Sequence, residues 1–193
     1  MDDIEAGKLA LRDQLLTARG RLPVGVLAER AHQVSARLLA TDEVRRAATV
    51  AAYVSVGREP GTGVLLDALR EAGKRVILPL LQADNDLDWA TYTGPGSLRT
   101  ARRGLLEPDT PALGAEAVAT ADVVIVPGLA VDGAGVRLGR GGGSYDRVLG
   151  RIPVGTFVCV VLNDNELLDR VPVAAHDRAV TAAVTEERLV RFR

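Results

Sequence analysis

The stretch VVIVPGLAVDGAGVRLGRGGGSYDRVLGR, residues 123–151, decides how the rest of the chain is interpreted. It opens with the β-branched run 123–126, which is typical of a strand buried on both faces of a parallel sheet. Pro127 and Gly128 end that strand, and a glycine-rich loop follows in which Arg137 and Arg140 are the cations. Residues 144–149 have the pattern of a first helical turn. The stretch therefore predicts a strand, a long glycine loop and a helix in succession.

A loop of this composition is suited to binding an anion. Glycines let backbone N–H groups approach an anion closely, a helix N-terminus adds unpaired donors, and arginines grip phosphate or carboxylate in a forked geometry. Two other interpretations stay open here. One is a flexible connector. The other is a dinucleotide-binding loop, since residues 139–144 approach the G-x-G-x-x-G/A pattern. That match is weak, because a true fingerprint follows its strand directly, whereas about a dozen residues intervene here.

Apolar periodicity and turn residues predict the other elements. Helices are expected at 4–19, 24–39, 62–73 and 111–121, and strands at 49–56, 74–80, 87–92, 155–162 and 180–185. In this scheme Leu16 faces the core, Thr62 caps its helix and Pro79 ends its strand. Successive β-α-β units imply parallel strands, and ligands bind beyond the carboxyl ends of such strands. The predicted fold class is α/β: a single three-layer α/β/α domain over residues 1–193 with a mostly parallel, Rossmann-like central sheet.

Composition and charge exclude several classes of protein. A formal net charge of -1 argues against a nucleic-acid-binding surface, and 3% aromatic residues imply a core of Ala, Val and Leu. Cys159 lies in an apolar run and is expected to be a buried hydrophobic residue, with no cysteine partner for a disulfide. The first residues lack a signal-peptide pattern, and no apolar run approaches the length of a membrane span. We expect a soluble, cytoplasmic protein without nucleic-acid or membrane partners.

Residues 126–149, VPGLAVDGAGVRLGRGGGSYDRVL, resemble the signature of the 5-formyltetrahydrofolate cyclo-ligase family, also called 5,10-methenyltetrahydrofolate synthetase. Val131 and Ser144 depart from it, since Phe and Tyr are usual there. The resemblance implies a monomeric enzyme that uses ATP, with Mg²⁺ as cofactor, to convert 5-formyltetrahydrofolate to 5,10-methenyltetrahydrofolate, ADP and phosphate. In the implied reaction the formyl oxygen is phosphorylated and N10 then attacks the activated carbon.

The resemblance also implies roles for particular residues. Lys8 and Arg12 match a Lys-x-x-x-Arg pattern whose cations reach the nucleotide phosphates, and Lys8 is expected on an exposed helix face. The implied ATP-binding residues are Lys8, Leu9, Ala10, Leu11, Arg12, Arg137, Leu138, Gly139, Arg140, Gly141, Gly142, Gly143, Ser144 and Tyr145. The implied substrate-binding residues are Val56, Glu59, Gly61, Arg140, Gly141, Gly142, Gly143 and Ser144. The implied catalytic residues are Arg137, Arg140 and Tyr145, and the implied magnesium ligands are Asp146 and Asp177.

Several assignments stay open. Gly61 stands where the family has an acidic residue, so either Glu59 or another residue accepts the N–H edge of the pterin, and a Gly61→Glu change is expected to improve folate binding. Glu107 is either a ligand or a cap, and His176 with Asp177 forms either a magnesium-binding pair or a polar turn. Arg19 has no assigned role. Two other functions remain: a sugar-phosphate- or CoA-handling enzyme of the same architecture, and a nucleotide- or folate-binding protein without catalysis.

Overall fold

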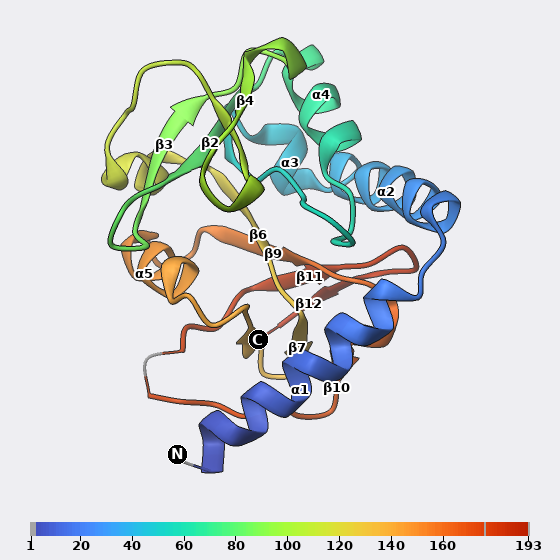
Figure 1. The fold of residues 1–193 in the computed structure, drawn as a ribbon. Coiled ribbons are helices and arrows are strands. Elements are labelled where there is room, and N and C mark those ends of the chain that lie inside the picture. The colour runs from blue at the N-terminus through green and yellow to red at the C-terminus, as the bar shows by residue number, and fades with distance from the viewer. Residues whose placement is uncertain (1–2, 176, 193) are drawn as a thin grey trace.

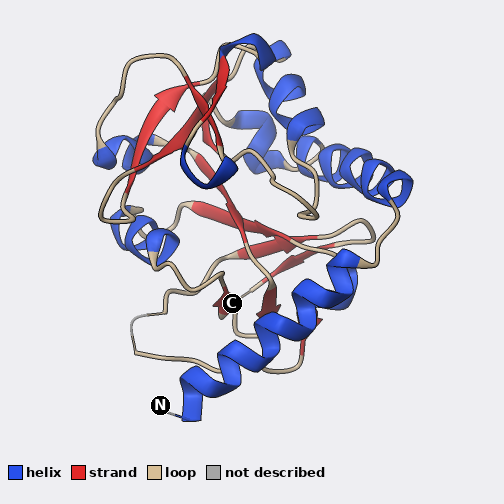
Figure 2. Ribbon diagram, viewed as in Figure 1, coloured by secondary structure: helices blue, strands red, loops and turns tan. Residues whose placement is uncertain are grey.

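The central element of the fold is a seven-stranded sheet, seen in a computed structural model that describes residues 3–175 and 177–192 (Figures 1 and 2). Its strand order is β12-β11-β9-β6-β1-β2-β3. The bounds are β1 (Thr49–Ala51), β2 (Arg75–Leu81), β3 (Leu87–Thr91), β6 (Val123–Pro127), β9 (Phe157–Val161), β11 (Ala182–Val184) and β12 (Leu189–Arg191). The strands from β11 to β2 run parallel, and the edge strands β3 and β12 are antiparallel to their neighbours. The predicted mostly parallel α/β sheet is confirmed.

Strand β6 shows why the sheet is covered on both faces. Val123 and Ile125 pack in the apolar cluster of α2 (Val24–Leu39), α3 (Asp42–Arg46) and α4 (Gly63–Glu71). Val124 and Val126 pack on the opposite face with the 3-10 helix η3 (Ala115–Thr120) and α5 (Ser144–Arg151). Because successive strand side chains point to opposite faces, a continuous apolar run needs a helix layer on each side. The three-layer arrangement follows from that pattern.

Helix α1 (Asp3–Gly20) packs on a second, three-stranded sheet built largely from the glycine-rich segment (Figure 1). This sheet has the order β10-β7-β8, with β7 (Ala130–Asp132), β8 (Arg137–Leu138) and β10 (Leu167–Leu168). Leu15 of α1 is buried against it beside Leu129 and Leu138. Leu16, which was expected to face the core, is 38% exposed, because the surface that α1 covers is narrow.

Two groups of short elements remain. One lies in the upper part of the molecule in Figure 1, and the other is a single 3-10 helix before β10. A two-stranded sheet pairs β4 (Leu98–Thr100) with β5 (Leu106–Pro108), and the 3-10 helices η1 (Pro95–Ser97) and η2 (Arg102–Gly104) flank β4. The 3-10 helix η4 (Asp164–Glu166) leads into β10. In residues 3–175 and 177–192, no helix is both long enough and apolar enough to cross a bilayer.

Several predicted boundaries were wrong for tertiary reasons. The strand expected at 49–56 ends at Ala51, and the 111–121 helix is only the short η3. Thr62 does not cap α4 with its side chain; its hydroxyl donates to Tyr53 O (2.7 Å) and accepts from Ser55 N (2.9 Å). Pro79 lies inside β2, paired with the edge strand β3, where a missing N–H is tolerated. Strands β7, β8, β10 and β12 were not predicted.

Candidate active site

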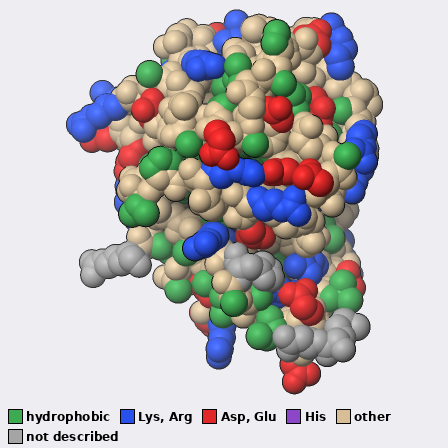
Figure 3. Space-filling model, turned by 90° about the vertical axis from the view of Figure 1, so that its left-hand side faces the viewer, with side chains coloured by type: hydrophobic (Ala, Val, Ile, Leu, Met, Phe, Trp, Pro, Cys, Tyr) green, Lys and Arg blue, Asp and Glu red, His purple; other side chains and the backbone are tan. Residues whose placement is uncertain are grey.

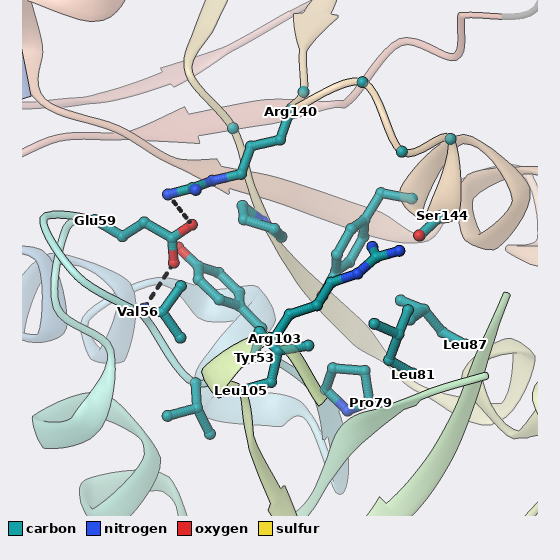
Figure 4. Close-up of a pocket in the computed structure, with 18 of the residues that line it drawn as sticks. Tyr53, Val56, Glu59, Pro79, Leu81, Leu87, Arg103, Leu105, Arg140 and Ser144 are labelled. Carbon is teal, nitrogen blue, oxygen red and sulfur yellow. Dashed lines mark hydrogen bonds and ion pairs between the residues drawn. The ribbon is translucent and has the colours of Figure 1, made fainter. Parts of the chain in front are cut away.

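A cavity of about 540 Å³ opens where β1, β2 and β6 end at their carboxyl edge. This is the edge at which the sequence predicts ligands. One wall is apolar and comes from the loop after β1, the ends of β2 and β3, and the loop between β4 and β5 (Figure 4); its members include Val56, Pro79, Leu81, Leu87 and Leu105. The opposite wall is the glycine loop, Gly139 to Gly143, together with Arg137 and Arg140. The cavity therefore joins an apolar surface to a cationic, backbone-rich one.

Glycine is required at several positions of this loop for physical reasons. Gly141 and Gly143 have φ values of 94° and 72°, which side chains rarely adopt. A Cβ at Gly139 would lie 2.8 Å from Arg137 Nη1, and one at Gly141 would lie 3.3 Å from Arg12 Cζ. The glycines thus let two guanidinium groups approach the backbone closely.

Arg137 is buried beneath the loop. Its Nη1 donates to Pro127 O (3.1 Å), its Nη2 pairs with Asp146 Oδ1 (3.2 Å), and its guanidinium lies 5.8 Å from the centre of the Tyr145 ring. Its Nε has no hydrogen-bond partner within the described part of the chain. Burial lowers the pKa of Arg137, whereas the negative charge of Asp146 opposes that shift. A buried cation with an unused donor beside a cavity is well placed to meet an anion.

Arg140 and Glu59 face each other across the cavity (Figure 4). Arg140 Nη2 lies 3.1 Å from Glu59 Oε1, and Glu59 Oε2 accepts a hydrogen bond from Val56 N at 2.9 Å. The Arg140 side chain is 54% exposed, so this pair is of the kind worth about 0–1 kcal/mol. A ligand can therefore displace it at little cost. The backbone bond keeps Glu59 in place when Arg140 moves.

Two tyrosines supply hydroxyl groups to the site. Burial is the main cause that raises the pKa of Tyr53 and of Tyr145, and the negative charge of Glu59 adds to both shifts. Both phenols therefore stay protonated at neutral pH and can donate a hydrogen bond. Tyr53 was not predicted as a site residue, because the sequence pattern placed it inside a longer strand. Its position just after a buried strand could have indicated a site residue, since ligands bind at the carboxyl ends of such strands.

Helix α1 lies next to the glycine loop, although none of its residues lines the cavity. Arg12 Nε donates to Gly139 O at 3.0 Å. Lys8 is 4% exposed, and its Nζ pairs with Asp177 Oδ2 at 2.6 Å. The expectation that Lys8 lies on an exposed face was wrong, because the segment that carries Asp177 covers it. The side chains of Leu9 and Ala10 are exposed, and Leu11 packs against the small sheet.

A buried ion pair that sequence reasoning missed anchors α1 to the cavity rim. Arg19, 2% exposed, donates to both carboxylate oxygens of Glu166 (2.7 and 2.8 Å) and to Gly128 O (2.7 Å). Glu166 also accepts from Asn163, through its backbone N–H (2.8 Å) and its side-chain amide (3.0 Å). The two partners are 147 positions apart, so no local pattern could have paired them.

Besides the residues of α1 and Asp177, two further implied site residues, Gly61 and Leu138, lie away from the cavity wall. Leu138 is buried in β8 among apolar neighbours. At Gly61 an added Cβ would lie 2.9 Å from Ala31 Cβ of α2. The expectation that Gly61→Glu improves folate binding stays a prediction, and the geometry argues against it, because the new side chain would meet α2 at its first atom. Glu107 does line the cavity, and its Oε1 accepts from Leu81 N at 2.8 Å.

The two implied magnesium ligands differ in the number of hydrogen bonds that their carboxylates already accept from the protein. Asp146 lines the cavity, and apart from its Oδ1 pair with Arg137 it has no other hydrogen bond within the described residues. Asp177 Oδ2 is bonded to Lys8 and accepts from Ala174 N at 2.7 Å. His176 lies outside the described residues. No group of three or more His, Cys, Asp or Glu side chains suited to a metal occurs in residues 3–175 and 177–192. Since Mg²⁺ bridging phosphates needs only one or two protein carboxylates, Asp146 fits such a site.

The fold and the cavity together define an α/β enzyme domain with an anion-binding glycine loop at the carboxyl ends of its strands. The sequence model of the 5-formyltetrahydrofolate cyclo-ligase family matches residues 4–186. A 5-formyltetrahydrofolate cyclo-ligase from Mycolicibacterium smegmatis is 44% identical over 186 residues, 94% of each chain. One from Escherichia coli K12 is 32% identical over 169 residues, 83% of this chain and 90% of the relative. The chain belongs to the 5-formyltetrahydrofolate cyclo-ligase family, a family of ligases.

A solved structure agrees with this assignment. The NMR structure of Aquifex aeolicus 5,10-methenyltetrahydrofolate synthetase superposes with a TM-score of 0.84 at 27% identity, covering 96% of this chain and 93% of that one. The similarity therefore extends over nearly the whole length of both chains.

Proposed function

We propose that the protein converts 5-formyltetrahydrofolate to 5,10-methenyltetrahydrofolate with consumption of ATP and release of ADP and phosphate, in the presence of Mg²⁺. The observation that carries the proposal is the two-sided cavity. An apolar wall suited to flat rings faces a glycine loop with arginines suited to phosphates. Membership of the family supports the same substrate pair.

In this proposal ATP binds along the glycine loop. Backbone N–H groups from Gly139 to Gly143 and the start of α5 contact the phosphates, while Arg12 and Arg140 add positive charge. Lys8 contributes from behind the loop, where its pair with Asp177 holds α1 in position. Cations from α1 and the glycine loop, together with backbone N–H groups of the loop and of the start of α5, lie along one surface. An extended anion such as a triphosphate could contact all of them, whereas a single carboxylate could not.

The folate binds against the apolar wall. Its reduced pterin presents an N–H edge, and Glu59 is one of two carboxylates on that side of the cavity, the other being Glu107. Val56 N binds Glu59 Oε2, so that Oε1 is left for a ligand that displaces Arg140. Tyr53 also lines the cavity, and its neutral hydroxyl can donate a hydrogen bond to a carbonyl oxygen or ring nitrogen of the pterin. Val56 and Leu105 flank the ring plane.

The chemistry needs positioning and charge neutralisation more than a protein nucleophile. The formyl oxygen attacks the γ-phosphorus and ADP leaves. N10 then attacks the activated carbon, loses its proton, and phosphate departs to leave the methenyl bridge. Arg137 and Arg140 neutralise the negative charge on the transferring group, and Tyr145 donates a hydrogen bond from its neutral hydroxyl. No step requires Cys159, which is buried in the sheet.

Asp146 is the residue that we propose holds Mg²⁺, with Asp177 closer to Lys8 in a supporting position. When bound, the ion would neutralise phosphate charge and orient the nucleotide. Arg137 keeps the Asp146 carboxylate directed along the loop. We further propose that residues 1–193 act as one domain, as a monomer in the cytoplasm.

The test is a spectrophotometric assay for the methenyl product, with ATP hydrolysis followed in parallel. Product formation that requires both ATP and 5-formyltetrahydrofolate is expected. Arg140→Gln should lower the rate, whereas Arg45→Gln, on an exposed side chain of α3, should not. ATP hydrolysis without folate, or with a sugar phosphate or CoA in its place, would favour the other enzyme class. Binding of both ligands without product would identify a protein that has lost catalysis.

A further inference from the structure

The outer rim of the cavity carries an arginine to which neither the family signature nor the proposed reaction gives a role. Arg103 lines the cavity from η2, and in Figure 4 its side chain extends in front of the apolar wall toward Ser144. Its φ is 57°, a conformation that non-glycine residues seldom adopt. Unfavourable backbone of this kind persists where surrounding contacts hold it.

The contacts that hold it come from the tip of the β2–β3 hairpin. Arg103 Nη2 donates to Asn85 Oδ1 at 3.0 Å, and Asn85 is the other described non-glycine residue with a positive φ, at 65°. The tip is in turn fixed to α5: Arg147 Nη1 donates to Asp84 O (2.8 Å), and Arg151 forks onto Asp86 (2.7 and 2.6 Å). Figure 3 shows basic and acidic side chains side by side on the face that carries β3 and α5. Arg103 is exposed to solvent, and its bond to Asn85 holds it at the cavity.

The charges around the cavity are unevenly satisfied. Three arginines line it, of which Arg137 pairs with Asp146 and Arg140 with Glu59. Arg103 has no ion-pair partner within residues 3–175 and 177–192, and its recorded bond is to a neutral amide. Its charge is therefore available to an anion that enters the cavity mouth.

The position of Arg103 indicates which anion. Arg12 marks the phosphate end of the glycine loop through its contact with Gly139. Arg103 instead belongs to the apolar wall, in the segment that also supplies Leu105, and its brace lies at the β2–β3 tip. A ligand whose rings occupy the apolar wall lies beside Arg103, so a charged group that projects from those rings can come within reach of its guanidinium. On the proposed function, that ligand is a folate, whose benzoyl ring continues into a glutamyl group with carboxylates.

We propose that Arg103 binds a carboxylate of the glutamyl tail and thereby makes the protein selective for folates that carry glutamate. The inference rests on the proposed function, since it assigns one end of that substrate. The braced guanidinium supplies a forked donor that matches a carboxylate.

The experiment compares 5-formyltetrahydrofolate with its pteroate counterpart, which lacks the glutamyl group, for wild type, Arg103→Gln, Arg103→Lys and the control Arg102→Gln. Arg102 is the exposed neighbour in η2 and does not line the cavity. Calorimetric binding without ATP and steady-state KM values are both measured. Arg103→Gln should weaken binding of the glutamate-bearing folate about two- to fivefold, the range of an exposed ion pair. Pteroate affinity and the KM for ATP should not change, Arg103→Lys should recover part of the loss, and Arg102→Gln should match wild type.

Three results overturn the inference while wild type still binds folate: no effect of Arg103→Gln, an equal loss for both folates, or a raised KM for ATP alone. The last would assign Arg103 to phosphate. If wild type neither binds nor converts either folate, the proposed function itself fails and this inference fails with it. The wild-type measurements therefore separate the two failures.

Discussion

Replacing Arg19 with methionine tests whether the buried pair with Glu166 holds α1 in place. The change removes hydrogen bonds of 2.7 and 2.8 Å to Glu166 and of 2.7 Å to Gly128 O, and it leaves a carboxylate that is 1% exposed without its cation. Breaking a buried pair from one side costs about 3–5 kcal/mol. A domain with a typical stability of about 5–15 kcal/mol should remain folded at 25 °C but with a much lower denaturation midpoint.

The assay is urea unfolding followed by circular dichroism, with Arg191→Met as the matched control. Arg191 pairs with Glu43 at the surface, with its side chain 54% exposed, so its loss should cost no more than about 1 kcal/mol. The double variant Arg19→Met with Glu166→Leu removes both charges and should recover much of the stability lost in Arg19→Met, because no buried charge is left unpaired. A loss for Arg19→Met no larger than that of the control would refute the reasoning.

Three further predictions concern the site and its surroundings. Asp146→Asn should raise the Mg²⁺ concentration needed for turnover at least tenfold, on the order of one lost charge-assisted contact, and should also lower apo stability because buried Arg137 loses its counter-charge; a wild-type magnesium titration would remove the residue from the metal site. Gly61→Ala should destabilise by about 1–3 kcal/mol through its collision with α2, while Gly63→Ala, where an added Cβ meets nothing within 4 Å, should not, as thermal unfolding will show. Arg151 lowers the pKa of Asp86 to about 2, so the stability this pair supplies is present at neutral pH and is lost as pH falls from the ordinary carboxyl pKa toward 2. Asp86→Asn should therefore cost about 2 kcal/mol at pH 7 and roughly half that at pH 3, and a difference that is independent of pH would contradict the assignment.

The parts of the fold that the sequence predicts well are those with a local cause. The apolar run 123–126 cannot be placed in water on either face, so it predicts the buried central strand and the two helix layers. The glycine loop and the start of α5 are likewise visible, because glycine clusters and a following amphipathic turn are local signals. The short strands β7, β8 and β10 have two or three residues each, too few for any periodicity.

What the sequence predicts poorly depends on partners far along the chain. Lys8 has the pattern of a surface lysine until the segment carrying Asp177 covers it. Gly61 occupies a position where the family has an acidic residue. In the structure, a side chain added at this position would point at α2. Arg103 lies at the cavity with a positive φ, a backbone conformation that cannot be predicted from its residue type. The assignment of roles to the cavity residues stays a prediction, although the structure brings most of them together.

The pair between Lys8 and Asp177 spans 169 positions of the chain and has a consequence for the order of assembly. During synthesis α1 emerges before the other described elements, whereas the carboxylate that pairs with its lysine emerges much later. The small sheet and the fork on Glu166 that also hold this helix are completed by segments made after the glycine loop. Closing so long a loop costs more entropy than closing the shorter loops between neighbouring strands such as β1 and β2. A nascent chain can therefore form contacts such as those between β1 and β2 early, whereas the helix behind the glycine loop is held in place only after the segment that carries Asp177 has been made.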